Sequence, residues 1–228
     1  MTDYLVATIK PWNVEAFHRH SPTLPGQWHL VETPEDLESA IRTSTPRYVF
    51  FPHWSWRVPT QVLEQIECVC FHMTDVPYGR GGSPLQNLIL RGHDETMLSA
   101  LRMVETLDAG PVYGQRKLSL EGRAQHIYER AANLTYELIA WIVTENPEPE
   151  KQHGQVVEFR RRRPEESHLP HTDNPRVMCD HIRMLDAATY PHAYIRHGPW
   201  RIEFTEAQTR GDQIVGRFHM RREDDEGD

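Results

Sequence analysis

The sequence contains few cysteines and no long apolar stretch. Three cysteines, Cys68, Cys70 and Cys179, stand among 228 residues, and an odd, low number does not fit the disulfide framework of a secreted protein. No apolar run approaches the ~20 residues that a membrane-spanning helix needs. The first residues, MTDYLVATIKPWN, lack the basic region and apolar stretch of a signal peptide. We therefore expect a cytoplasmic protein with reduced thiols and no membrane partner.

Basic residues are also in the minority. The chain has 25 lysines and arginines against 33 aspartates and glutamates, a net charge of −8 with neutral histidines. This balance argues against a dedicated nucleic-acid binder, because such proteins usually present a basic face. With 38% hydrophobic and 25% charged residues, the composition is that of a globular protein large enough to bury a hydrophobic core.

The order of the apolar segments predicts an α/β fold. Expected strands cover residues 5–9, 28–31, 47–51 and 68–71, and expected helices begin at Thr33, Pro59 and Ser83 and cover residues 119–145. Strands that alternate with helices are typical of a parallel sheet. We expect residues 1–150 to form this α/β domain, with residues 75–84 as a loop.

The sequence pattern changes after residue 150. We expect a strand at 155–159, a helix at 176–185, a strand pair within 193–204, and an acidic tail at 223–228 without fixed structure. These segments predict that residues 151–228 form a small C-terminal extension.

Two residues stand out as candidate catalytic groups. His72 follows a predicted parallel strand and opens into a glycine-rich loop, and ligand sites in open α/β sheets lie at such strand ends. A histidine there can serve as general acid or base. Asp108 lies in a tight turn with Gly110 and Pro111. An aspartate beside His72 would orient the ring and stabilise its protonated form.

The stretch from Phe71 to Pro111 resembles the signature of the formyltetrahydrofolate-dependent formyltransferases, a family that includes methionyl-tRNA formyltransferase and the sugar N-formyltransferases. The family pattern is a histidine, a Pro-x-x-Arg-Gly loop, a Pro-led helix and a Leu-Asp-x-Gly turn. The matching positions are His72, Val76–Gly81, Ser83-Pro84 and Leu107–Gly110. A weaker likeness covers most of residues 46–195, including Val49–Pro59, the Pro147–Gly154 step, Arg183 and Tyr190-Pro191.

The resemblance implies a Rossmann-like formyltransferase fold and transfer of a formyl group from 10-formyltetrahydrofolate, released as tetrahydrofolate, to an amine. It assigns catalysis to His72, Asp108 and the position of Cys70, and substrate binding to Arg80 and Gly81, with no metal. The folate-binding positions it implies are Pro52, His53, Trp54, Thr74, Asp75, Val76, Pro77 and Leu107. Possible homodimerisation is implied by the sugar-modifying relatives.

One position departs from the family pattern. The family usually has asparagine two residues before the histidine, where this chain has Cys70. The asparagine amide steadies the formyl oxygen as negative charge develops, and a thiol is a much weaker donor. Loss of one such donor typically costs ~10²–10³ in rate. Either another group such as Thr74 replaces it, or the enzyme is slow, or its role has drifted.

Several residues carry alternative interpretations. Cys68, Cys70 and His72 share one strand face, but a zinc site would need a fourth ligand and a different spacing. His53 and Trp54 suit simple packing as well as a pterin or a nucleotide base. Arg80 suits a carbonyl contact as well as a substrate contact.

The expected acceptor is a small-molecule amine, that of a nucleotide-linked 4-amino sugar. Few residues remain after ~200 for the C-terminal β-barrel of the methionyl-tRNA enzymes, the N-terminal region is a trimmed form of the fold, and the acidic charge disfavours tRNA. The alternatives are a methionyl-tRNA or other aminoacyl formyltransferase and, prompted by Cys70, a non-catalytic folate-binding protein.

Overall fold

The computed structural model describes residues 1–223, and its centre is a six-stranded sheet in the order β2-β1-β3-β4-β6-β7. The strands are β1 (Asp3–Ala7), β2 (Gln27–Val31), β3 (Tyr48–Phe51), β4 (Glu67–His72), β6 (Glu95–Arg102) and β7 (Val112–Ser119). The first four of these strands run parallel, while β6 is antiparallel to both β4 and β7. The predicted α/β fold with a mostly parallel sheet is therefore confirmed.

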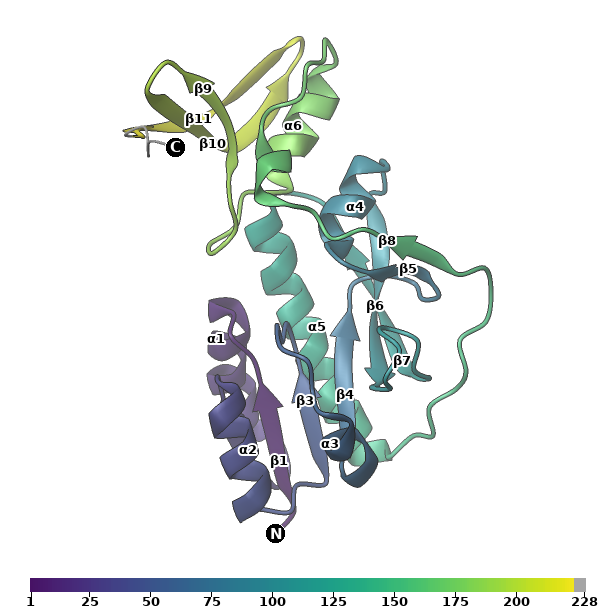
Figure 1. The fold of residues 1–228 in the computed structure, drawn as a ribbon. Coiled ribbons are helices and arrows are strands. Elements are labelled where there is room, and N and C mark those ends of the chain that lie inside the picture. Colours follow the sequence, from purple (N-terminus) through teal and green to yellow (C-terminus); the bar gives the residue numbers. More distant parts are fainter. Residues whose placement is uncertain (224–228) are drawn as a thin grey trace.

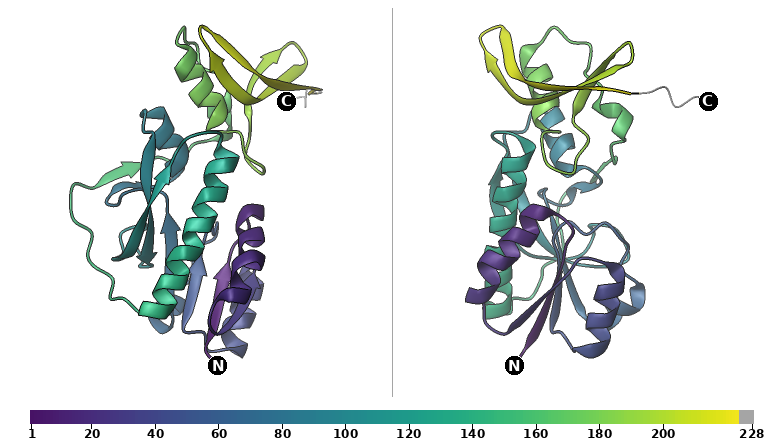
Figure 2. Two further views of the ribbon diagram at one scale, coloured as in Figure 1. Left: turned by 180° about the vertical axis from the view of Figure 1, so that it is seen from behind. Right: turned by 90° about the vertical axis from the view of Figure 1, so that its left-hand side faces the viewer.

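Helices cover both faces of this sheet. On one face α1 (Pro11–His20) packs against the long α5 (Ala124–Glu145), and α4 (Pro84–Leu90) contributes to the same core (Figures 1 and 2). On the other face α2 (Pro34–Thr43) and α3 (Thr60–Gln65) pack over a smaller core built around Leu5, Val49 and Cys68. The sheet thus lies between two layers of helices, and the loops that connect strands to helices lie at the edges of the sheet.

The N-terminal region holds one more helix than we expected. The chain forms β1, α1, β2, α2 and β3 in succession, so it contains a helix after the first strand that we did not predict, while the expectation of a trimmed N-terminal region stays a prediction. The first strand covers Asp3–Ala7 rather than residues 5–9, and Pro11 occupies the first turn of α1, where its missing N–H costs nothing. This helix has no acidic residue in its first turn and no side-chain cap, so Pro11 is the one usual start signal that it carries.

Three other boundaries differ from the prediction. The long helix begins at Ala124 rather than at 119, because residues 112–119 form β7. The expected loop at 75–84 contains β5 (Tyr78–Gly81), which pairs in parallel with β8 (Val157–Phe159). The strand pair expected within 193–204 is a three-stranded antiparallel sheet of β9 (Ala193–His197), β10 (Trp200–Arg210) and β11 (Gln213–Arg222).

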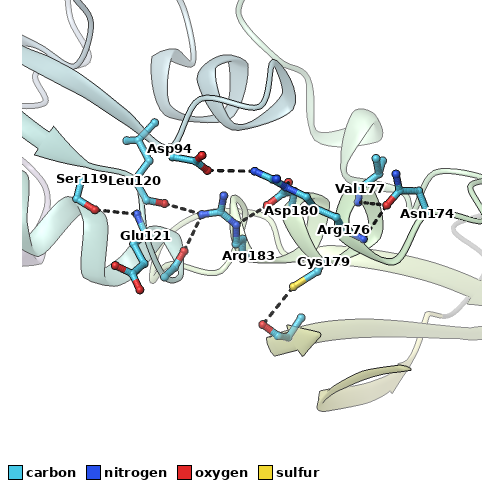
Figure 3. Close-up of polar contacts among 12 residues, drawn as sticks. Asp94, Ser119, Leu120, Glu121, Asn174, Arg176, Val177, Cys179, Asp180 and Arg183 are labelled. Atoms are coloured by element: carbon cyan, nitrogen blue, oxygen red, sulfur yellow. Dashed lines mark hydrogen bonds and ion pairs between the residues drawn. The ribbon is translucent and has the colours of Figure 1, made fainter. Parts of the chain in front are cut away.

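The C-terminal sheet lies beyond one end of α5, and α6 (Pro175–Arg183) packs against β10 of this sheet and contacts α4 (Figure 1). Arg183 joins the two parts: its Nη1 donates to the carbonyl oxygens of Leu120 and Gly122, at 2.6 and 2.9 Å, and its Nε donates to Asp180 (Figure 3). The main core contains Met184, Leu185 and Ala193 together with residues of α5. The division at residue 150 stays a prediction.

The acidic end of the chain is only partly described. Residues 224–228 of the predicted tail lie outside the described residues, whereas Glu223 pairs with Arg196 at 3.1 Å. Of the helices within residues 1–223, none has the length and apolar character needed to span a membrane.

Candidate active site

His72 is the last residue of β4 and is 8% exposed. Its Nε2 lies 2.7 Å from the carbonyl oxygen of Gly79. Because a carbonyl can only accept, Nε2 carries the proton of this hydrogen bond. Nδ1 is then the ring nitrogen that can gain or lose a proton during a reaction.

Asp108 faces that second nitrogen. Its Oδ2 lies 3.5 Å from Nδ1 of His72 and accepts a hydrogen bond of 2.9 Å from the backbone N–H of Gly81. Both side chains are largely buried, with exposed fractions of 10% for His72 and 9% for Asp108. The two residues singled out from the sequence thus form one pair, and Gly81 holds the carboxylate in place.

The turn that carries Asp108 depends on its local backbone. Asp108 has φ of 52°, a left-handed conformation that aspartate tolerates better than most residues. A Cβ on Gly110 would lie 1.7 Å from the carbonyl oxygen of Arg102, so only glycine allows the chain to pass there. These two residues bring the turn back toward the end of β4.

Gln152 connects the turn that carries Asp108 to Arg80 by hydrogen bonds. Its Nε2 donates to the carbonyl oxygens of Asp108 and Gly110, at 2.8 and 2.7 Å. Its Oε1 accepts from Nε and Nη2 of Arg80, at 3.0 and 2.7 Å. Arg80 therefore contacts a neutral amide in this structure, and its role toward substrate stays a prediction.

Thr74 and Cys70 flank His72. The hydroxyl of Thr74, which is fully buried, lies 3.4 Å from the same Gly79 oxygen. Cys70 is a free thiol, and burial, helped by the negative charge of Asp108, raises its pKa. The thiol is therefore uncharged at neutral pH and presents a weak S–H donor beside the pair.

The segment after β3 lies at the same edge of the sheet. The carbonyl oxygen of Pro52 accepts from the hydroxyl of Thr8, at 2.5 Å, and His53 Nδ1 lies 3.0 Å from Nδ2 of Asn13. Burial, with the positive charges of Lys10 and His72, lowers the pKa of His53 to about 4. His53 is thus neutral at physiological pH and lies within electrostatic reach of His72.

The remaining predicted folate positions are more scattered. Val76 and Pro77 are buried and joined by a cis peptide bond. In contrast, Trp54 packs on Phe51 and Trp56 over the smaller core. Asp75 is exposed and accepts from Gln115, and Leu107 is 69% exposed.

Besides Gln152, the residues near the site that were not among the predicted site residues include Lys10, Asn13, Tyr128 and Tyr190. Lys10 and Asn13 follow β1 as His53 follows β3, so the strand-end argument would have included them. Tyr128 comes from α5, and no local pattern marks it; Tyr190 comes from the segment after α6 and was noted only within the weaker family likeness.

A metal centre finds no support in this arrangement. Within residues 1–223, no group of three or more histidine, cysteine, aspartate or glutamate side chains is placed to hold a metal ion. Cys68 is buried in the smaller core, and burial raises the pKa of its thiol to about 12. A buried neutral thiol behaves as a small apolar side chain.

This fold and this site define a Rossmann-like α/β protein with a His–Asp pair at the carboxyl edge of its parallel strands. The structure of a methionyl-tRNA formyltransferase from Clostridium thermocellum matches 97% of this chain and 100% of its own at 35% identity, with a TM-score of 0.93. Residues 164–221 match the family model described as the C-terminal domain of methionyl-tRNA formyltransferase. The chain belongs to the formyltransferase family.

More distant relatives share the fold. HypX from Aquifex aeolicus, solved in complex with tetrahydrofolic acid, matches 90% of this chain and 37% of its own at 15% identity, with a TM-score of 0.74. A 4-N formyltransferase from Francisella tularensis matches 86% and 93% at 14% identity, with a TM-score of 0.67. The methionyl-tRNA formyltransferase of Bacillus thuringiensis is 27% identical over 92% of this chain, which spans 64% of that relative's length.

Proposed function

We propose that this protein transfers a formyl group from 10-formyltetrahydrofolate to an amine, and that the acceptor is a nucleotide-linked 4-amino sugar. The observation that carries the proposal is the buried pair in which Asp108 faces Nδ1 of His72 at 3.5 Å while Gly79 fixes Nε2. Such a pair is suited to moving a proton at one defined nitrogen.

The chemistry moves one proton from the acceptor nitrogen to the donor nitrogen, in two transfers. As the acceptor nitrogen bonds to the formyl carbon, it must lose a proton, and Nδ1 of His72 is placed to take it. Asp108 stabilises the resulting imidazolium by its negative charge. The bond from the formyl carbon to the donor nitrogen then breaks, and His72 returns the proton to that nitrogen. Formyl amide and tetrahydrofolate are the products.

Apolar residues lie at the edge of the sheet that carries the pair. Pro52, Val76 and Pro77 are buried at the ends of β3 and β4, and apolar walls with a few fixed polar groups suit a flat pterin ring. The HypX relative, solved with tetrahydrofolic acid, supports a folate as the formyl donor. When bound, the folate supplies the activated formyl group.

Charge pairing in the C-terminal sheet supports the sugar acceptor. Arg196 pairs with Glu223, Arg201 with Glu203 and Arg217 with Glu206, at 3.1, 2.8 and 3.0 Å. Paired arginines release fewer counterions from RNA than free ones. Together with the net charge of −8, this pairing disfavours a tRNA-binding face.

Methionyl-tRNA is the second candidate acceptor. The match of residues 164–221 to the C-terminal domain of methionyl-tRNA formyltransferase favours it. Our argument that too few residues follow ~200 for such a domain is weakened, because α6, β9, β10 and all but the last residue of β11 lie within that match.

A turnover assay tests the proposal. We would follow tetrahydrofolate release from 10-formyltetrahydrofolate with a panel of nucleotide-linked 4-amino sugars and, separately, with methionyl-tRNA. Release that requires one amino sugar and is lost in His72→Ala is the expected result. Release with methionyl-tRNA alone would favour the second candidate. Tight folate binding without release from any acceptor would support a non-catalytic folate-binding protein.

A further inference from the structure

Lys10 is one of three lysines in the chain, and it lies at the carboxyl edge of the sheet. It follows β1, as His53 follows β3 and His72 ends β4. These three strands are neighbours in the order β1-β3-β4 and run parallel. Three basic side chains therefore lie side by side along the edge that carries the candidate active site.

Lys10 has no acidic partner. Its Nζ donates to the hydroxyl of Thr189 at 2.8 Å and lies over the rings of Tyr190 and Trp12, at 4.7 and 5.8 Å from their centroids. Partial burial lowers the pKa of Lys10, and among residues 1–223 no carboxylate forms an ion pair with it. The ammonium charge of Lys10 therefore interacts with a neutral hydroxyl and with aromatic rings, and an incoming anion can add an ion pair to these contacts.

A stack of aromatic rings fixes this arrangement. Trp12 and Tyr128 stack at 4.8 Å with an interplanar angle of 3°, and Tyr128 and Tyr190 stack at 5.2 Å. Tyr190 comes from the C-terminal part of the chain and Tyr128 from α5. The stack therefore positions the lysine between segments that are distant in sequence.

Several energetically unfavourable local features lie around Lys10. Thr189, a β-branched residue, has φ of 69°, in a left-handed region that such residues rarely adopt, and His53 has φ of 57° in the same region, which histidine adopts more readily. The indole Nε1 of Trp12 is buried without a hydrogen-bond acceptor among the described residues. Such costs persist mainly where function requires them.

We propose that Lys10 binds a phosphate group of the nucleotide-linked acceptor and so holds its amine beside His72. This inference rests on the proposed function. A lysine ammonium is a point charge that commonly binds phosphate, and the nucleotide-linked acceptor that we propose carries phosphate. Lys10 would thus be a specificity-determining residue that contacts the acceptor but not the formyl donor.

Binding of a phosphate probe tests this assignment without turnover. We would titrate inorganic pyrophosphate, uridine diphosphate and acetate into the full-length protein by calorimetry, using wild type, Lys10→Met and Lys10→Arg. Lys117→Met is the matched control, because Lys117 is an exposed lysine paired with Glu95 on the surface. Thermal unfolding of each variant verifies that it is folded.

We expect Lys10→Met to weaken pyrophosphate and uridine diphosphate about ten- to hundredfold, as for the loss of one charge-assisted hydrogen bond. Lys10→Arg should bind more tightly than Lys10→Met, and Lys117→Met should match wild type. In turnover, Lys10→Met should raise the KM for the acceptor by a similar factor while the KM for the formyl donor stays unchanged.

Three results would overturn the inference: no pyrophosphate binding by wild type, equal binding by wild type and Lys10→Met, or acetate binding as tight as pyrophosphate. Dependence on Lys10 for an RNA ending in CCA but not for uridine diphosphate would also overturn it. Pyrophosphate binding that depends on Lys10, without turnover of any acceptor, would refute the proposed function and leave the phosphate site standing.

Discussion

Replacement of Asp108 by asparagine isolates the charge that faces His72. The two side chains have the same shape, and the asparagine oxygen can still accept from the N–H of Gly81, which lies 2.9 Å from Oδ2 in this structure. The turn should therefore keep its conformation. What the variant loses is the negative charge 3.5 Å from Nδ1 of His72.

The distance between Asp108 and His72 determines the size of the effect that we expect on kcat. Two unit charges 3.5 Å apart attract by about 5 kcal/mol at an effective dielectric constant of 20. Part of this attraction offsets the cost of removing both groups from water. We therefore expect Asp108→Asn to lower kcat by about 10²–10³-fold, since each 1.36 kcal/mol is a factor of about ten, and to leave the KM for the formyl donor nearly unchanged.

A double-mutant cycle verifies that the effect acts through His72. In a His72→Ala background the Asp108→Asn change should have almost no further effect on kcat, because the imidazolium that it stabilises is gone. A kcat within threefold of wild type would refute the reasoning, as would an equally large loss in both backgrounds. Urea unfolding of each variant distinguishes lost catalysis from lost stability.

Three further predictions follow from the same region. Cys70→Asn should raise kcat by about 10²-fold by restoring a strong donor; an unchanged rate for a folded variant contradicts that role. The pKa of His53 is lowered to about 4 in the folded protein. As pH drops from about 6.5 to 4, the imidazole is therefore protonated in the unfolded chain before it is protonated in the folded one, and the unfolding free energy falls. His53→Gln should remove up to about 3 kcal/mol of that fall in urea unfolding, and a pH dependence equal to that of wild type would contradict this assignment. Gln152→Leu leaves Arg80 and the carbonyl oxygen of Asp108 without their hydrogen-bond partner. We expect the unfolding free energy to fall by about 2 kcal/mol and kcat to fall as well. Wild-type values of the unfolding free energy and of kcat would show that Gln152 does not hold the turn.

The sequence predicted the parallel strands well, because each is a short apolar run followed by a turn. It also predicted the meeting of His72 and Asp108, because the family resemblance covers that whole segment. It did not predict β7. Gly114 interrupts the strand pattern there, and it is required because a Cβ would lie 2.8 Å from the ring of Trp141. The reason for that glycine is thus a contact with a helix that follows later in the chain.

Other parts of the site depend on contacts between distant segments. Gln152 reaches Asp108 across 44 positions, and Lys10 reaches Thr189 across 179. Neither pairing leaves a local pattern, since both partners lie in irregular segments. Sequence reasoning can place such residues at strand ends but cannot select their partners before the packing of α5 and α6 is known.

The shared core has a consequence for synthesis on the ribosome. Met184, Leu185 and Ala193 are almost completely buried in the same core as Ile127, Ala131 and other residues of α5. A nascent chain that has emerged only as far as α5 therefore exposes apolar surface that its own later residues must cover. Chains arrested before residue 193 should bind chaperones that recognise apolar segments, and release from them should coincide with the arrival of β9.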